Sequence, residues 1–181
     1  MLALLLAACL TLSPAREVPL QSLGLVQSEG RFYYDDQTFT GMAVVTGPGG
    51  VLRERASYRR GKRDGLREKW HSNRVLGEQT PYRRGKREGV SRTWWADGTL
   101  RSETVLVDGV VHGTQRQWYR SGALFKERNL KMGQEDGLQR AWRENGVLYA
   151  NYEARDGRTF GLNRSKLCFK LEEEEVVSAR Y

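Results

Sequence analysis

Eight basic side chains are the residues of this sequence whose types and spacing most clearly suggest chemistry. They belong to two clusters, Arg59-Arg60-Gly61-Lys62-Arg63 and Arg83-Arg84-Gly85-Lys86-Arg87, which lie 24 residues apart. Cations gathered on one rigid edge attract polyanions. We call the eight side chains the basic ridge: Arg59, Arg60, Lys62, Arg63, Arg83, Arg84, Lys86 and Arg87. The ridge predicts a site for lipid headgroups, anionic polysaccharide or an acidic protein, although a solvated edge that resists aggregation explains it equally simply.

Cys9 is a second residue with a recognisable chemistry. It ends the apolar run Met-Leu-Ala-Leu-Leu-Leu-Ala-Ala-Cys, and Leu6-Ala7-Ala8-Cys9 resembles a bacterial lipoprotein signal, in which the cysteine is acylated. Typical signal peptides have about 15–30 residues and a basic start, which this run lacks, so an unprocessed apolar end is the alternative. We expect a lipoprotein held in the bacterial envelope by Cys9, and an inert buried thiol at Cys168.

Catalytic and metal-binding patterns are missing from the sequence. His71 and His112 stand at different phases of the repeat described below, with no cysteine or carboxylate at metal-ligand spacing. There is no G-x-S-x-G motif and no phosphate-binding loop. Asp64, Glu88 and Asp136 occupy the same position of the repeat, just before the repeat glycine, and capping of a turn is the simplest explanation for their carboxylates. We predict no enzymatic activity, no cofactor and no metal.

Several residue types recur every 24 positions, so the chain is a tandem array of 24-residue repeats. The fold of this repeat must position the basic clusters. The tryptophans, one series of glycines and one series of leucines keep this step without an insertion. They are Gly41, Gly65, Gly89, Gly113, Gly137 and Gly161; Trp70, Trp94, Trp118 and Trp142; and Leu52, Leu76, Leu100, Leu124 and Leu148. The basic clusters have the same phase, so we expect them to be neighbours on one edge.

Each unit also carries two turn signals about a dozen residues apart, which leaves room for short strands. Asp97-Gly98, Ser121-Gly122 and Asn145-Gly146 predict two-residue hairpin turns. The second signal is the glycine series that includes Gly61 and Gly85. The unit is therefore predicted to be a β-hairpin, and the array an antiparallel meander.

Alternation along the strands predicts two faces. Leu66 and Trp70 share one side, and Leu76 and Tyr82 have the same parity in the returning strand. We expect the tryptophans to be buried core residues rather than a platform for sugars or bases, because one buried aromatic hides about 150–250 Å². Trp95 and Tyr119 come one position later, so we expect them on the opposite, exposed face.

The recurring residues resemble the bacterial variant of the MORN repeat. Residues 113–133 read G-T-Q-R-Q-W-Y-R-S-G-A-L-F-K-E-R-N-L-K-M-G, and five units over residues 41–160 fit this pattern. The first unit departs from it, with Thr46 in place of tryptophan, and Arg74 replaces the turn glycine of the second. The resemblance implies an elongated, single-layered array of β-hairpins. Many bacterial proteins of this kind are labelled toxin–antitoxin system YwqK family antitoxins.

These features give an all-β, elongated single-layer antiparallel meander with four regions. They are a lipoprotein-type signal at 1–9, a tether at 10–29, a MORN-like array at 30–160 with full units starting at 41, 65, 89, 113 and 137, and a C-terminal cap with an acidic tail at 161–181. Arrays of repeats usually provide surfaces for binding.

The sequence favours a non-enzymatic binding or scaffolding protein of the bacterial cell envelope. Its expected partner is a protein or an anionic envelope component, with a lipid anchor in the membrane. The alternative, implied by the family label, is a cytoplasmic antitoxin that neutralises a partner toxin. The net charge of +8 permits nucleic-acid binding, but we consider it unlikely because an exported protein would not meet the genome.

Overall fold

The computed structural model describes residues 16–162, 169–172 and 175–178 of the 181-residue chain. The strands are β1 (Glu17–Pro19), β2 (Gly24–Val26), β3 (Arg31–Tyr34), β4 (Gln37–Thr38), β5 (Gly41–Thr46), β6 (Leu52–Arg59), β7 (Lys62–Trp70), β8 (Leu76–Arg83), β9 (Lys86–Arg87), β10 (Gly89–Trp94), β11 (Leu100–Val107), β12 (Val110–Trp118), β13 (Leu124–Lys131), β14 (Gln134–Trp142), β15 (Leu148–Arg155), β16 (Arg158–Leu162), β17 (Phe169–Glu172) and β18 (Glu175–Ser178). Helical residues in the described part form only two 3-10 turns, η1 (Leu20–Ser22) and η2 (Pro48–Gly50).

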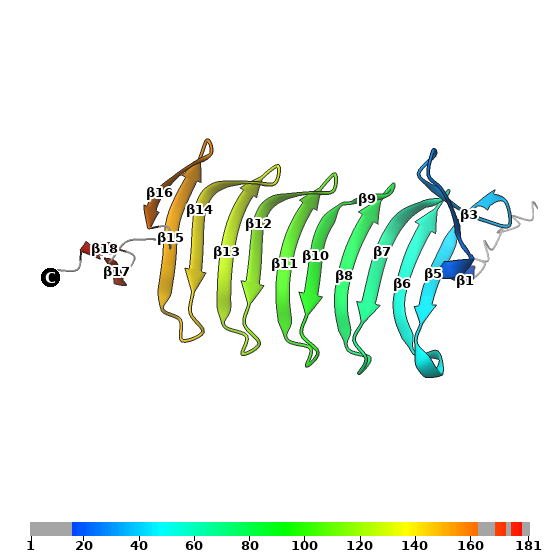
Figure 1. The fold of residues 1–181 in the computed structure, drawn as a ribbon, viewed down its shortest axis with the longest axis horizontal. Helices are drawn as coiled ribbons and strands as arrows, with labels where there is room; N and C mark the ends of the chain where they lie inside the picture. Colours follow the sequence, from blue (N-terminus) through cyan, green and yellow to red (C-terminus); the bar gives the residue numbers. More distant parts are fainter. Residues whose placement is uncertain (1–15, 163–168, 173–174, 179–181) are drawn as a thin grey trace, which may run out of the picture.

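One long sheet of 13 strands contains most of the chain. Its order is β1-β5-β6-β7-β8-β10-β11-β12-β13-β14-β15-β16, with β9 paired to β8. Strands β5 to β16 pair antiparallel in chain order, except that β10 follows β8 and β9 pairs only with β8, and they form an elongated layer (Figure 1). The predicted all-β antiparallel meander is therefore confirmed.

Two kinds of hairpin loop lie at opposite edges of this sheet. At the upper edge in Figure 1, Arg60 and Gly61 both have positive φ, 50° and 76°, as a two-residue type I′ turn requires. At the lower edge, the Trp95 amide donates to the Thr99 carbonyl at 2.8 Å, and only Gly98 has positive φ between them. The prediction that Asp97-Gly98 forms a two-residue turn is therefore wrong, since three residues make this loop.

A β-bulge near the lower edge changes which face the side chains take. In β8, Leu76 pairs with Trp70, but Glu78 pairs with the residue before Trp70, so Gly77 is an extra residue. The same shift recurs in β11, β13 and β15. Leu76 therefore lies on the face of Trp70, and Tyr82 lies on the other. The prediction that Leu76 and Tyr82 share a face is wrong, because simple alternation assumes a strand without an extra residue.

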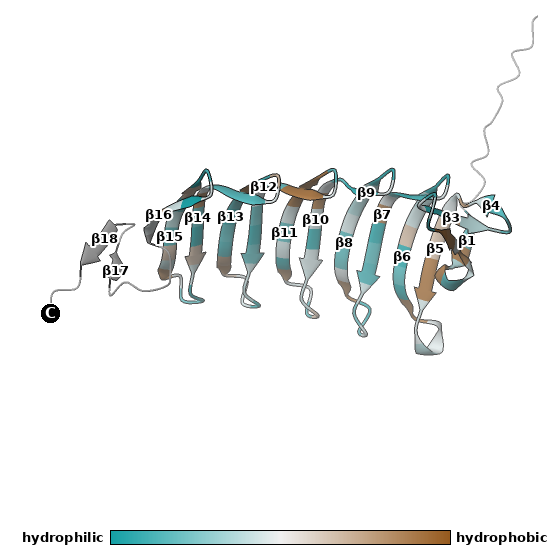
Figure 2. Ribbon diagram, turned by 45° about the horizontal axis from the view of Figure 1, so that its top comes forward, coloured by the Kyte–Doolittle hydropathy of each residue, from teal (hydrophilic) through white to brown (hydrophobic). Residues whose placement is uncertain are grey.

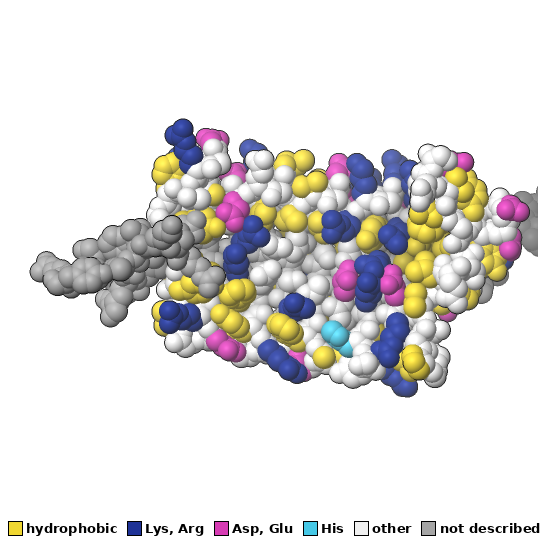
Figure 3. Space-filling view, viewed as in Figure 1, with side chains coloured by type: hydrophobic (Ala, Val, Ile, Leu, Met, Phe, Trp, Pro, Cys, Tyr) yellow, Lys and Arg dark blue, Asp and Glu magenta, His cyan; other side chains and the backbone are white. Residues whose placement is uncertain are grey.

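Two faces with different chemistry result. The polar face, turned toward the viewer in Figure 3, carries a central row of cross-strand neighbours: Arg67, Thr80, Ser91, Thr104, Gln115, Arg128 and Gln139. The tryptophan face carries Trp70, Trp94, Trp118 and Trp142, each paired with a leucine. Trp95 and Tyr119 lie on the polar face as predicted, although both are half-buried rather than exposed.

The four repeat tryptophans are only half-buried, because no described element forms a second layer over them. The prediction that they form a buried core is wrong for this reason. Mostly small residues are buried along the sheet, among them Ala56, Ala141 and Ala150. Cross-strand ion pairs support the tryptophan face instead, as between Arg92 and Glu103 at 2.8 Å. The strands accordingly alternate between teal and brown in Figure 2 without a continuous apolar layer.

The largest cluster of buried hydrophobic side chains lies at the N-terminal end of the sheet. Val18, Phe39, Ala43, Ala56 and Tyr58 pack together there. β1 pairs parallel with β5 and covers the edge of the sheet, which would otherwise present unpaired backbone groups. The stretch from Arg16 to residue 29, which we expected to belong to a tether, therefore contains β1, η1 and β2.

The ends of the chain are described only in part. Cys9 and Cys168, for which we expected an acyl anchor and a buried thiol, lie outside the described residues. β17 and β18 pair antiparallel beyond the array. Within the described ranges no helix is long and apolar enough to cross a membrane.

Candidate anion-binding site

The basic ridge occupies two neighbouring type I′ turns at the upper edge of the sheet. Arg60-Gly61 joins β6 to β7, and Arg84-Gly85 joins β8 to β9. The φ angles of Arg60 and Arg84 are 50° and 51°, a left-handed conformation that is uncommon for residues other than glycine. The predicted neighbourhood of the two clusters is therefore observed.

Backbone hydrogen bonds hold the two turns against each other. The Gly85 amide donates to the Arg63 carbonyl at 2.7 Å, and the Gly109 amide donates in the same way to Arg87 at 2.8 Å. Since two strands separate successive upper turns, their spacing is about 10 Å. The ridge is thus an edge of fixed backbone rather than a pair of independent loops.

Carboxylates at the predicted phase cap these turns. Asp64 Oδ2 accepts from the Arg84 amide at 3.1 Å, and Glu88 Oε2 accepts from the Asp108 amide at 2.7 Å. Thr40 Oγ1 plays the same part for the Arg60 amide at 2.9 Å. The expectation that Asp64 and Glu88 serve turn chemistry is confirmed.

Five ridge cations have no side-chain hydrogen bond or ion pair to any described residue. They are Arg59, Arg60, Lys62, Arg83 and Arg84, of which all but the half-buried Lys62 are exposed. Arg59 pairs across its hairpin with Lys62, and Arg83 pairs with Lys86. Like charges directly opposite each other are unfavourable in a sheet. An anion that bound between them would relieve this repulsion.

Arg63 does not belong to the accessible part of the ridge. Its guanidinium lies 5.7 Å from the ring centroid of Phe32, 5.9 Å from Tyr58 and 5.6 Å from Tyr82. Its Nε also donates to the Tyr58 hydroxyl at 3.3 Å. The half-buried Arg63 therefore packs among aromatic rings on the polar face. Cluster spacing alone does not show that residue 63 turns toward these rings.

Lys86 and Arg87 stand at the far end of the ridge with local partners. Lys86 Nζ lies 3.1 Å from Asp108 Oδ1, and both side chains are more than half exposed. Arg87 donates to the Gly109 carbonyl at 3.2 Å. Exposed pairs of this kind contribute little to stability, roughly 0–1 kcal/mol, so Lys86 can exchange Asp108 for another anion.

Arg31 is a further cation at the first turn that the sequence analysis missed. A Cβ built on Gly61 would lie 3.0 Å from Arg31 Cβ, which places Arg31 directly against the ridge. The Phe32 amide donates to the Gly61 carbonyl at 2.7 Å and holds this contact. Arg31 precedes the five full units, so the 24-residue recurrence carried no signal for it.

Along the same upper edge the basic clusters end at the next turn, and only the single cations Lys131, Arg155 and Arg158 flank the later turns of the described sheet. Val107 and Val110, 38% and 37% exposed, flank the turn after the ridge, where Figure 2 changes from teal to brown. The described residues also contain no group of three or more histidines, cysteines or carboxylates placed to hold a metal ion. The first two upper turns thus form a bounded patch of positive charge.

Comparison with known proteins gives no further assignment. No protein-family model matches the chain, and no curated protein matches it.

Proposed function

We propose that this protein is a non-enzymatic binding surface of the bacterial cell envelope and that the basic ridge is its anion site. The supporting observation is the group of five cations on two fixed turns that lack side-chain partners within the described chain. We further propose that each 24-residue unit corresponds to one hairpin of a MORN-like array. Such an array displays side chains at regular intervals rather than enclosing a reaction site.

The spacing of the turns favours a polyanion over a single small ion. About 10 Å separates successive upper turns, which is close to the Debye length of about 8 Å at physiological ionic strength. The two clusters therefore act on a ligand together. A membrane rich in anionic headgroups, an acidic polysaccharide or an acidic protein offers several negative charges at this spacing.

The place of the ridge in the fold is consistent with an acyl anchor at Cys9. Six residues separate Cys9 from Arg16, and an extended chain spans at most about 3.3–3.6 Å per residue, so this connection reaches roughly 25 Å. β3 and the first ridge turn are in contact through Phe32 and Gly61. An anchor at Cys9 would therefore keep the ridge near the membrane surface.

Vesicle co-sedimentation tests the proposal. Vesicles with about one third anionic lipid should retain the purified chain at low salt and release it at high salt, since salt screens surface charge. The variant R60Q/K62Q/R84Q/K86Q should lose retention.

The matched control is R74Q/K131Q/R143Q/R158Q, which removes the same number of positive charges from exposed positions away from the ridge. It should retain most of the binding. Equal retention by the ridge variant and the wild type would refute the proposal, and equal losses in the two variants would show that only net charge matters.

A further inference from the structure

A pocket of about 750 Å³ opens at the lower ends of β10 to β13, at the opposite end of the strands from the basic ridge. Its size falls within the range of roughly 300–1,000 Å³ typical of small-molecule sites. Three aromatic residues, Trp95, Tyr119 and Phe125, contribute to its lining. The Tyr119 and Phe125 rings pack at 5.0 Å between centroids with an interplanar angle of 58°.

The β-bulges build this pocket. Arg101 and Phe125 are the extra residues of β11 and β13, so their side chains turn to the polar face beside Trp95 and Tyr119. The Arg101 guanidinium lies 4.6 Å from the Trp95 ring centroid. The sheet itself does not require large side chains here, because Gly77 is the extra residue of β8.

Position 71 shows how a neighbouring unit fills the same space. His71 and Gly77 stand 24 residues before Trp95 and Arg101, and a Cβ on Gly77 would meet the His71 ring at 2.8 Å. His71 Nε2 lies 3.0 Å from the Trp94 carbonyl oxygen. In the unit of His71 and Gly77, the compact contact between these two residues fills the space. The next two units carry the larger rings of Trp95, Tyr119 and Phe125 and leave a pocket.

Polar groups with remaining hydrogen-bonding capacity also line the pocket. The Gln117 amide is half-buried and has no side-chain hydrogen bond within the described chain. The Thr93 and Ser102 hydroxyls are 2.6 Å apart, and this contact uses only one of their two protons. Trp95 Nε1 is buried and has no acceptor among the described residues. Buried donors are normally paired, and a ligand oxygen would reach Nε1 only after neighbouring side chains moved, because this atom has almost no accessible surface.

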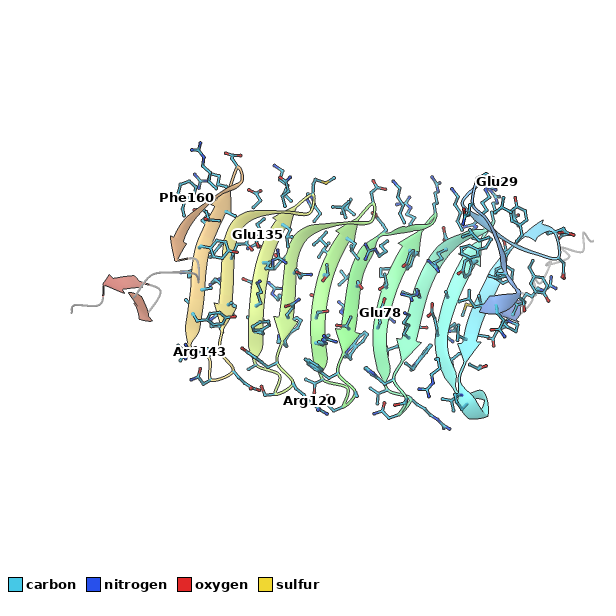
Figure 4. All side chains as sticks on the ribbon, in the orientation of Figure 1. Glu29, Glu78, Arg120, Glu135, Arg143 and Phe160 are labelled. Atoms are coloured by element: carbon cyan, nitrogen blue, oxygen red, sulfur yellow. The ribbon has the colours of Figure 1, made fainter. Side chains whose placement is uncertain are left out.

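The charges around the pocket balance. Arg120 Nε lies 2.5 Å from Asp97 Oδ2, so this cation is neutralised locally. Arg101 and Glu144, both exposed, contribute one charge of each sign. Figure 4 shows Arg120 at the lower turn of the central units, away from the ridge. The pocket therefore offers no net charge to an ionic ligand.

We propose that this pocket binds a neutral oligosaccharide. A pyranose ring has apolar C–H faces that pack on aromatic rings and a rim of hydroxyls that both donate and accept hydrogen bonds. The lining matches both parts: Trp95, Tyr119 and Phe125 supply aromatic surface, and the Gln117 amide and Arg101 guanidinium are planar polar groups. This site is separate from the ridge and does not rest on its function.

Titration of the full chain with neutral hexasaccharides tests this assignment. Chitohexaose, cellohexaose and maltohexaose are the probes, with tryptophan fluorescence and calorimetry as readouts. At least one should bind with a Kd below about 1 mM. The affinity should change less than about twofold between low and high salt, because no net charge is involved.

Two variants and two controls separate the pocket from the rest of the protein. W95H/R101G, which installs the residues found at His71 and Gly77, and Q117A, which installs the alanine found at Ala141, should each weaken binding roughly tenfold or more. R53G, at the same phase as Arg101 but outside the pocket, and the ridge variant should bind as the wild type does. Thermal unfolding of each variant establishes that it is folded.

Several results would overturn the assignment. One is no binding of any of the three probes up to about 10 mM. Another is undiminished binding by the folded Q117A variant. Tighter binding of an aromatic hexapeptide than of every sugar would assign the pocket to a peptide instead.

Discussion

Replacing Arg67 with glutamine tests how a single-layer sheet holds charged residues at its centre. Arg67 Nε lies 2.8 Å from Glu54 Oε1, and Nη1 lies 3.0 Å from Glu78 Oε1. The three side chains sit over β6 to β8 on the polar face, where Figure 4 labels Glu78. Gln115 and Gln139 occupy the equivalent positions in later units, so glutamine fits the backbone there.

The expected loss follows from partial burial. Arg67, Glu54 and Glu78 are 17%, 18% and 31% exposed. Breaking a fully buried pair costs about 3–5 kcal/mol, whereas an exposed pair contributes about 0.2–1 kcal/mol. Solvent therefore screens part of the effect, and R67Q should lower the free energy of unfolding by about 2 kcal/mol. The loss arises because Glu54 and Glu78 then keep only Lys69 as a nearby cation among the described residues, and its Nζ lies farther away, at 3.7 Å from Glu54 Oε2.

Urea unfolding followed by tryptophan fluorescence measures this loss. The double variant R67Q/E78S, which installs the serine found at Ser102, should recover about 1 kcal/mol because one carboxylate is removed. R155Q is the matched control, since the Arg155–Glu153 pair is 66% and 44% exposed and should contribute little to stability. A loss in R67Q no larger than in R155Q would refute the reasoning, as would a double variant less stable than R67Q.

Three further predictions concern other parts of the array. The hydrogen bond from Arg120, with one from the Thr99 amide, lowers the pKa of Asp97 to about 2. Because the folded-state pKa of Asp97 lies below its unfolded value, the stabilisation is present above about pH 4 and is lost as the pH falls toward 2. The difference in Tm between the wild type and D97N should therefore vanish over that range. A difference in Tm that stayed constant would contradict this prediction. Trp118→Ala should cost about 2 kcal/mol in urea unfolding, below the 3–5 kcal/mol of a fully buried ring, because Trp118 is half-buried. Glu88→Ala removes the acceptor of the Asp108 amide and should cost about 1 kcal/mol, while a Tm equal to that of the wild type would show that water replaces the cap.

The periodicity of the sequence was sufficient to predict the meander and the common edge of the two basic clusters. It also placed Asp64 and Glu88 at the turns, because their phase is adjacent to the repeat glycine. It could not assign the faces, since an extra residue such as Gly77 reverses the parity of the returning strand. Nothing in simple alternation distinguishes a bulged strand from a regular one.

Contacts between distant parts of the chain were the other source of error. Phe32 precedes the five full units and lies with Tyr58 and Tyr82 around Arg63, which makes that ridge cation less accessible. Similarly, Val18 pairs with Ala43 in the parallel β1–β5 contact, which a pattern of neighbouring hairpins cannot indicate. The candidate pocket was also missed, because it depends on which residues the bulges turn to the polar face.

The salt dependence of polyanion binding tests the central proposal most directly. A soluble acidic polysaccharide titrated at several salt concentrations should bind the wild-type chain with an affinity that falls steeply as salt increases, because bound cations displace counterions from the polymer. The ridge variant R60Q/K62Q/R84Q/K86Q should bind weakly with a shallow dependence, and the charge-matched control should keep the steep one. The same slope and affinity in the wild type and the ridge variant would contradict the assignment of the ridge as an anion site.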